Sequence, residues 1–244
     1  MRSVLTILFV AAFSVGTLSQ TEFDQPWRNP SRAIVIDPYE GNAIDWDRLA
    51  GDKRVAGIIH RATIGFRTDG QYLERKLKAK TSGYKWGSYH LGIAGDPIGQ
   101  ADYYLRNAAP ADDETMALDI EGLDSRKDMS LADAILFIDR VHAKTGRYPI
   151  LYGNHLVISE ISRVYASNGA FARVPLWYAR FKGSINDLPK TTWNTYSLWQ
   201  FSSEINCTAS DRKRCLYTVP GTSHDMDVNV FNGTVAEMRS RWPL

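Results

Sequence analysis

Acidic side chains stand at or next to the ends of several short apolar segments in this chain of 244 residues. Asp119 and Glu121 end one such segment, and Asp37 and Asp227 adjoin two others. Residues two apart in a strand face the same side, so Asp119 and Glu121 would project together. Two carboxylates held close raise one pKa, which leaves a protonated acid beside a charged base. Hydrolysis of a glycosidic bond requires this combination.

Aromatic side chains lie at or near the ends of the same segments. They are Tyr89, Tyr152, Trp177, Tyr178 and Trp199. Sugar rings stack on aromatic faces, so aromatic residues around a carboxylate cluster favour a carbohydrate cleft. Each ring taken alone is better explained by packing in the core. The aromatic residues therefore support the carbohydrate interpretation only as a group.

These residues must be positioned by a regular alternation of strands and helices. We predict strands at residues 33–36, 55–59, 85–89, 115–120, 149–152, 174–178, 196–200 and 226–228. Helices are expected at 71–80, 100–106 and 130–145, the last with Ser130 as N-cap and Gly146 at its end. Such alternation implies parallel pairing in a barrel or a doubly wound sheet. Eight strand candidates favour a single irregular α/β barrel of the TIM type, in which the strand ends converge on one mouth.

The first 19 residues have the pattern of a secretory signal peptide. Arg2 supplies a positive start, residues 4–15 are almost wholly apolar, and small residues follow. The apolar run is too short to span a membrane, although a retained anchor is the alternative. Cleavage after Gly16 or after Ser19 is compatible with the sequence. We expect an N-terminal extension over 20–32, the barrel over 33–244, and a secreted or periplasmic protein without stable membrane insertion.

Cys207 and Cys215 are the only cysteines in the chain. In an exported protein, two cysteines close together in a polar stretch predict a local disulfide. A redox pair or half of a metal site is the alternative, but the spacing is not C-x-x-C. The five histidines are scattered without a zinc-binding pattern, so we expect no metal.

Charge and motifs exclude other classes of protein. The chain has 29 Lys and Arg against 27 Asp and Glu, a net charge of +2, which is too small to indicate nucleic-acid binding. The sequence contains neither the G-x-S-x-G motif of serine hydrolases nor a P-loop. We therefore expect neither of these enzyme classes.

Several segments in order resemble the Chalaropsis-type lysozymes, which form glycoside hydrolase family 25. The segments are Asp37, Ile44-Asp45-Trp46, Arg61-Ala62-Thr63, Tyr89-His90, Gln100-Ala101-Asp102-Tyr103-Tyr104, Leu118-Asp119-Ile120-Glu121, Pro175-Leu176-Trp177-Tyr178-Ala179, Trp199-Gln200-Phe201-Ser202-Ser203 and Asp227-Val228-Asn229-Val230-Phe231. Together they extend from about Ala33 to Gly233. One such fragment would be a weak signal, whereas the whole series in the family's order is a specific one.

The resemblance implies hydrolysis of the β-1,4 bond between N-acetylmuramic acid and N-acetylglucosamine in peptidoglycan glycan strands, with no cofactor. Glu121 would be the general acid, and Asp119 would orient the substrate's N-acetyl group or stabilise positive charge. Asp37 and Asp227 would complete the acidic cluster. Arg61 and the five aromatic residues named above would contact the substrate. An inverting and a substrate-assisted retaining mechanism both remain open, and we expect a monomer.

Two segments depart from the family's pattern. The family's first strand usually continues as D-x-S-x-x-Q-G, whereas residues 37–41 read D-P-Y-E-G. Ile64 replaces the acidic residue of the family's K-A-T-E-G segment. Both changes fall on the expected rim of the cleft, so they leave open which glycan decoration is accepted. The alternatives are an inactive barrel that binds glycans and a glycosidase acting on chitin-like polymers.

Overall fold

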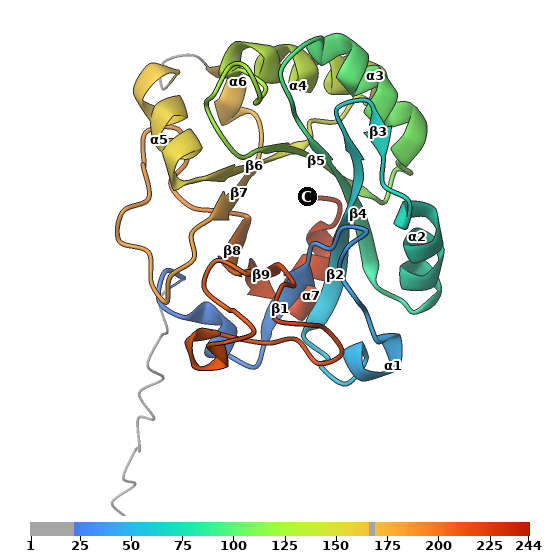
Figure 1. The fold of residues 1–244 in the computed structure, drawn as a ribbon. Helices are drawn as coiled ribbons and strands as arrows, with labels where there is room; N and C mark the ends of the chain where they lie inside the picture. Colours follow the sequence, from blue (N-terminus) through green and yellow to red (C-terminus); the bar gives the residue numbers. More distant parts are fainter. Residues whose placement is uncertain (1–21, 166–168) are drawn as a thin grey trace, which may run out of the picture.

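The computed structural model describes residues 22–165 and 169–244, and the predicted signal peptide lies outside these ranges. Within them the strands form one sheet that closes on itself, surrounded by helices (Figure 1). No helix in this part of the chain combines the length and the apolar character needed to cross a bilayer.

The barrel ring contains strands from the whole described chain. They are β1 (Arg32–Ile36), β2 (Val55–Ile64), β4 (Lys85–Leu91), β5 (Thr115–Ile120), β6 (Ile150–Asn154), β7 (Leu176–Ala179), β8 (Leu198–Ser202) and β9 (Val228–Thr234). The pairing of β1 with both β2 and β9 closes the ring. The short β3 (Arg67–Thr68) extends β2 as an antiparallel hairpin. The irregular α/β barrel is confirmed, and so are the predicted strands, except that the last is displaced: the prediction covers 226–228, whereas β9 begins at Val228.

The direction of the last strand differs from expectation. β9 is antiparallel to both of its neighbours, β1 and β8, whereas the other neighbouring pairs in the ring are parallel. Asp227 therefore precedes its strand instead of ending it. Because β9 runs in reverse, its beginning lies at the edge of the barrel where the parallel strands end.

The helices are concentrated in the first two thirds of the chain. They are α1 (Trp46–Leu49), α2 (Tyr72–Thr81), α3 (Pro97–Ala108), α4 (Leu131–Thr145), α5 (His155–Val164), α6 (Gly169–Ala172) and α7 (Val235–Arg241), with 3₁₀ turns η1 (Pro26–Arg28) and η2 (Arg212–Arg214). In α4, the Ser130 side chain accepts from the Asp133 amide and Gly146 adopts a φ of 72°, as predicted. Helix α3 begins earlier than predicted because Asp96 caps it and Pro97 occupies its first turn.

Side chains alternate between two cores. Val35, Ala117 and Leu198 point into the barrel, whereas Ile34 and Leu118 pack outward against the helices. In the view of Figure 1 the C-terminus lies within the ring of strands. There, the chain end fills the bottom of the barrel: the Trp242 indole donates to the Trp86 carbonyl at 2.9 Å, and the Leu244 amide donates to the Thr115 hydroxyl at 2.9 Å. The opposite end is thereby left as the only mouth of the barrel in the described part of the chain.

The described part of the N-terminal extension packs on the barrel. Trp27 stacks on Phe201 with ring centroids 3.8 Å apart, and Phe23 meets the edge of Tyr196. The Gln25 amide donates to the Gly183 carbonyl at 2.9 Å. The predicted boundary near residue 32 therefore does not separate a detached segment from the barrel core.

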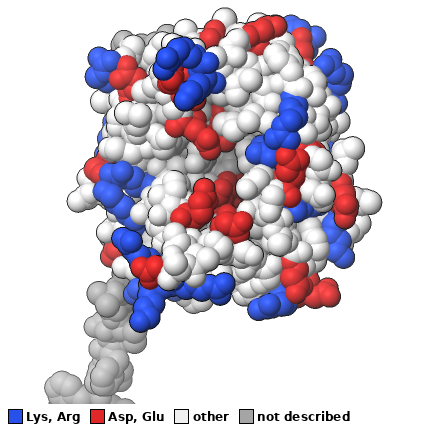
Figure 2. Space-filling model, in the orientation of Figure 1, with Lys and Arg blue, Asp and Glu red and all other residues white. Residues whose placement is uncertain are grey.

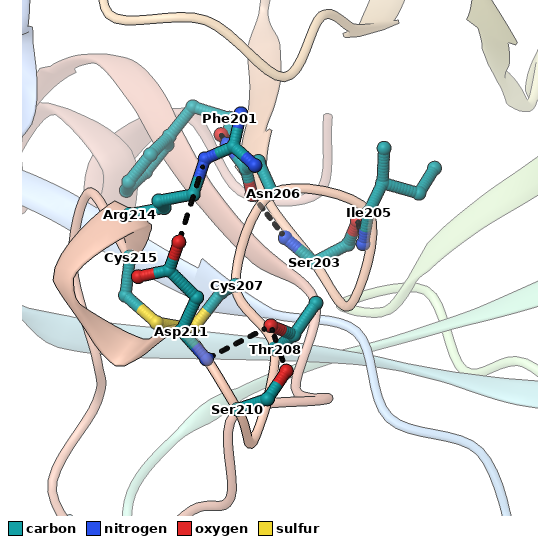
Figure 3. The surroundings of a disulfide bond; sticks show 10 residues. All are labelled: Phe201, Ser203, Ile205, Asn206, Cys207, Thr208, Ser210, Asp211, Arg214 and Cys215. Atoms are coloured by element: carbon teal, nitrogen blue, oxygen red, sulfur yellow. Dashed lines mark hydrogen bonds and ion pairs between the residues drawn. A yellow bond between two sulfur atoms is a disulfide. The ribbon is translucent and has the colours of Figure 1, made fainter.

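The predicted disulfide between Cys207 and Cys215 is present and closes a loop after β8 (Figure 3). Asn206 orders the start of this loop, since its side chain accepts from the Ser203 amide at 3.1 Å and donates to the Phe201 carbonyl at 2.9 Å. The disulfide thus closes the loop on itself, and the hydrogen bonds of Asn206 attach its start to the end of β8.

Replacing both cysteines by serine should lower the free energy of unfolding by about 2–3 kcal/mol, because the short loop is no longer closed in the unfolded chain. Urea unfolding under non-reducing conditions measures this loss. Wild-type protein unfolded in the presence of a reductant is the control, and it should fall to the stability of the double variant. Equal stability of variant and oxidised wild type would contradict the prediction.

Candidate active site

Four acidic residues come together at the mouth of the barrel. Asp37 follows β1, Asp119 and Glu121 lie at the end of β5, and Asp227 precedes β9. The Asp37 amide donates to the Asp227 carbonyl at 3.2 Å, which ties the two segments together. Figure 2 shows acidic side chains around a hollow in the middle of one face. The structure therefore brings together all four carboxylates that the sequence singled out.

Asp37 is buried and held by two amide side chains. Gln200 Nε2 donates to Asp37 Oδ2 at 2.7 Å, and Asn229 Nδ2 donates to Asp37 Oδ1. Each amide is oriented in turn, because Tyr152 donates to Gln200 Oε1 at 2.7 Å and Trp177 donates to Asn229 Oδ1. Burial raises the pKa of Asp37, and the negative charge of Asp227 raises it further. The hydrogen bonds from Asn229 and Gln200 lower it.

Gln200 and Asn229 were not among the predicted site residues, although both stand within segments that carried the family resemblance. Their signal was alternation: each is a polar residue at an inward position of a strand otherwise lined by apolar side chains, such as Leu198 and Phe231. Polar side chains inside a barrel need partners, and here the partners belong to the site.

Of the four predicted carboxylates, Asp119 is the one with a buried oxygen that lacks a hydrogen-bond partner. It is buried, and its Oδ1 has no hydrogen-bond partner. Burial raises the pKa of Asp119 well above its usual value, the charges of Glu121 and Asp227 raise it further, and Arg61 lowers it. An acceptor oxygen left free in the mouth is available to a donor group on a bound molecule.

Glu121 stands at the solvent-exposed edge of the cluster. Partial burial is the largest cause that raises the pKa of Glu121, and the negative charges of Glu204 and Asp128 raise it further. The positive charge of Arg61 lowers it. The Asn154 side chain donates to the backbone carbonyl of Glu121 at 2.6 Å and so fixes the chain at this point. Glu121 thus combines access from solvent with a pKa shifted toward the protonated form.

Two further acidic residues belong to the cluster. Burial raises the pKa of Asp227, and the charges of Glu204, Glu121 and Asp225 raise it further. Glu204 lies between the end of β8 and Cys207, and the Asp225 Oδ1 is buried without a partner. Sequence reasoning missed both residues, although Glu204 shows the signal used for the others, a carboxylate just after a strand.

Arg61 provides a positive charge in the wall of this acidic mouth. Its Nε lies 3.2 Å from Asp69 Oδ2 and its Nη2 lies 3.3 Å from Glu40 Oε1. Its positive charge lowers the pKa of both Asp119 and Glu121, so it acts on two members of the cluster. Glu40 comes from the D-P-Y-E-G segment, so the segment that departs from the family's pattern also supplies a partner for Arg61.

Three of the predicted aromatic contacts form the floor of the mouth. Tyr89 and Tyr152 meet the edge of Trp177, with ring centroids 6.3 and 5.1 Å away. None is more than 8% exposed. Burial raises the pKa of both tyrosines well above its usual value, so their hydroxyls stay protonated.

The structure does not bring Tyr178 and Trp199 to the mouth. The hydroxyl of Tyr178 lies 2.6 Å from His155 Nδ1, and the Trp199 indole donates to the Arg180 carbonyl at 2.7 Å. Both rings are fully buried in the outer core. Strand alternation is the reason, because Trp177 and Leu198, their neighbours in sequence, point inward. We therefore no longer assign Tyr178 and Trp199 to substrate binding.

The barrel and its acidic mouth are those of a glycoside hydrolase. The sequence profile of the family described as "Glycosyl hydrolases family 25" matches residues 36–209, and the chain belongs to this family. A search of curated proteins gave no match.

Solved structures agree with this assignment. The bacterial lysozyme from Streptomyces coelicolor is 25% identical with a TM-score of 0.69, over 85% of this chain and 95% of that one. The muramidase from Acremonium alcalophilum is 22% identical with a TM-score of 0.67, over 86% and 98% of the two chains. The spore cortex lytic enzyme SleM from Clostridium perfringens is 22% identical with a TM-score of 0.67, over 84% of this chain and 69% of that one.

Replacing Asp119 by Asn should stabilise the protein at neutral pH. A folded-state pKa raised above 3.8 means that the folded state loses stability as the pH rises from that value through the raised pKa. Removing the charge should raise the free energy of unfolding at pH 7 by more than about 1 kcal/mol. The gain should shrink near pH 3, where the carboxyl is protonated in both states.

Urea unfolding at the two pH values measures this difference. Asp102→Asn is the matched control, because Asp102 pairs with Arg140 at 2.7 Å and its pKa is lowered by that hydrogen bond. The control variant should gain no stability at pH 7. A lower free energy of unfolding for Asp119→Asn than for the wild type at neutral pH would contradict the prediction that the buried carboxylate destabilises the fold.

Proposed function

We propose that the protein is a muramidase that hydrolyses the β-1,4 bond between N-acetylmuramic acid and N-acetylglucosamine in peptidoglycan, with Glu121 as general acid. The observation that carries the proposal is the position of Glu121, a carboxyl group open to solvent, with a raised pKa, beside the buried Asp119 and the partly buried Asp227. Membership of the family and the similarity to the structures of a lysozyme and a muramidase support it.

Glu121 would donate its proton to the oxygen of the leaving sugar. A general acid must hold its proton at the working pH, and burial together with the charges of Glu204 and Asp128 favours that form. The backbone contact from Asn154 keeps the end of β5 in place during this transfer. This is the acid half of the chemistry that cleavage of a glycosidic bond needs.

Asp119 would act on the substrate from the buried side of the same strand. Its free Oδ1 can accept a hydrogen bond from the N-acetyl N–H of the sugar, which would orient the acetyl oxygen for attack. The same carboxylate would otherwise stabilise positive charge on the sugar while water attacks. The two routes give opposite anomeric configurations in the first product, so proton NMR of a fresh digest distinguishes them.

Asp37 would hold substrate or water rather than transfer a proton to the leaving group. Gln200 and Asn229 fix its two oxygens, so its direction in the mouth is set before substrate arrives. Arg61 limits the total negative charge of the site. We include export in this proposal, with the signal-peptide pattern of residues 1–19 and the disulfide as its support.

Replacing Glu121 by Gln should lower the rate of peptidoglycan hydrolysis about 10²–10⁴-fold, because the side chain keeps its shape but has no proton to donate. The measurement is release of soluble fragments from purified peptidoglycan, identified by mass and by the sugar at the reducing end. Wild-type protein should release fragments that end in reducing N-acetylmuramic acid. Glu160→Gln, on the exposed face of α5, is the matched control and should keep wild-type activity.

Each other outcome of this experiment has a distinct meaning. Near-wild-type turnover by Glu121→Gln would show that another group is the acid. Faster release from chitin than from peptidoglycan would indicate a glycosidase for N-acetylglucosamine polymers. Binding to several wall types without any release would indicate a glycan-binding barrel.

The pH dependence of the rate should respond to Glu204. Activity of an enzyme with a general acid falls as the pH rises through the pKa of that acid. Because the Glu204 charge raises the pKa of Glu121, Glu204→Gln should move the alkaline limb of the kcat/KM profile to lower pH. The profile of Glu160→Gln should coincide with that of the wild type. An alkaline limb that stays in place in Glu204→Gln would contradict the electrostatic role of Glu204.

A further inference from the structure

A glycan strand needs an accessible aromatic face for stacking, and the aromatic floor of the mouth does not offer one. Tyr89, Tyr152 and Trp177 are each 8% exposed or less. Within residues 22–165 and 169–244, the exposed aromatic side chains are Tyr39 at 38% and Phe66 at 55%. Tyr39 and Phe66 therefore carry the rings in this part of the chain that are most accessible to a sugar.

The backbone around Tyr39 is held firmly at the rim. Its amide donates to Asn42 Oδ1 at 2.9 Å, and its carbonyl accepts from the Asn42 amide at 3.0 Å and from Arg75 Nη1 at 2.8 Å. The preceding residue is attached to β2, because the Pro38 carbonyl accepts from the Arg61 amide at 3.0 Å. Tyr39 is thus presented in a fixed position two residues after Asp37.

Glu40 holds the same loop against the β2–β3 hairpin. Its carboxylate accepts from the Gly70 amide at 2.9 Å and from Arg67 at 2.6 Å. Its amide donates to Asp69 Oδ2 at 2.9 Å. The hydrogen bonds from Gly70 and Arg67 lower the pKa of Glu40, so Glu40 remains charged as the partner of Arg61. The loop is therefore organised before any substrate arrives.

The Tyr39 ring lies next to the acidic cluster through Arg61. The guanidinium carbon of Arg61 is 4.7 Å from the centre of the Tyr39 ring, a cation–π contact that covers one face, so a sugar would stack on the face turned away from Arg61. The same guanidinium lowers the pKa of both Asp119 and Glu121. One cation thus contacts the ring and acts on the carboxylates. Phe66 is different, since it lies in the turn before β3 and meets the edge of Tyr103 on α3.

We propose that Tyr39 is the stacking platform of a sugar subsite on the β1–β2 side of the mouth. The platform takes a pyranose ring of the glycan strand beside the bond that is cleaved. This inference rests on the muramidase function proposed above and adds a specificity residue to it. The family's pattern has Ser at this position, so the platform belongs to the segment in which this chain departs from that pattern.

The test compares Tyr39→Ala and Tyr39→Phe with the wild type on soluble peptidoglycan glycan strands. Tyr39→Ala should raise KM about tenfold, equivalent to about 1.4 kcal/mol of binding, and leave kcat within about twofold. Tyr39→Phe keeps the ring and should retain the wild-type KM. Phe66→Ala is the matched control, since it removes the other exposed aromatic ring, and it should leave both constants unchanged.

A pH profile separates stacking from an indirect effect through Arg61. If Tyr39 only positioned Arg61, Tyr39→Ala would free the guanidinium, change the pKa of Glu121 and displace the kcat/KM profile. The stacking role predicts a profile of unchanged shape and position. A displaced profile, an equal KM rise in Phe66→Ala, or loss of binding in Tyr39→Phe would each overturn the proposal.

Failure of this inference can be told apart from failure of the proposed function. The function fails if wild-type protein releases no fragments ending in reducing N-acetylmuramic acid. The platform fails if the wild type releases them and Tyr39→Ala has the same KM. Thermal unfolding of each variant confirms that the compared proteins are folded.

Discussion

Burial of carboxylates at one end of a closed barrel is the constraint on which the rest of this structure depends. Asp37, Asp119 and Asp227 lie where water solvates them poorly, and each charge disfavours ionisation of its neighbours. The fold compensates unevenly, because Asp37 receives two amide donors and Asp119 keeps a free oxygen. Two aspartates of one small site therefore differ in hydrogen bonding: the protein holds Asp37, whereas Asp119 can accept a hydrogen bond from a bound molecule.

The remainder of the barrel provides the stability that such a site requires. The chain end closes the bottom through Trp242, and the N-terminal extension covers one side through Trp27. Helices pack on the outer faces of the strands, so the inner and outer cores are both apolar away from the mouth. The acidic side chains are thereby collected at the end that the packing leaves open, the end at which other barrels of this type have their active sites.

Much of the fold and part of the site followed from local pattern. Apolar runs marked the strands, and Ser130 and Gly146 marked the ends of α4, because capping depends on residues close in sequence. The spacing of Asp119 and Glu121 placed them at one strand end. Glu204, just after β8, had the same local signal, whereas Asp225 could not be placed in this way, since it reaches the cluster at the end of a long loop whose path depends on contacts far along the chain.

The sequence by itself determined the element types, the strand-end carboxylates and the disulfide, since each depends on neighbours within a few residues. Only the tertiary structure decided which way β9 runs and hence why Asp227 reaches the mouth from the start of its strand. It also decided that Trp199 faces the outer core whereas Tyr39 stays exposed beside Arg61. The physical reason is that closure of the barrel sets the direction and inner face of every strand, and closure joins residues nearly two hundred positions apart.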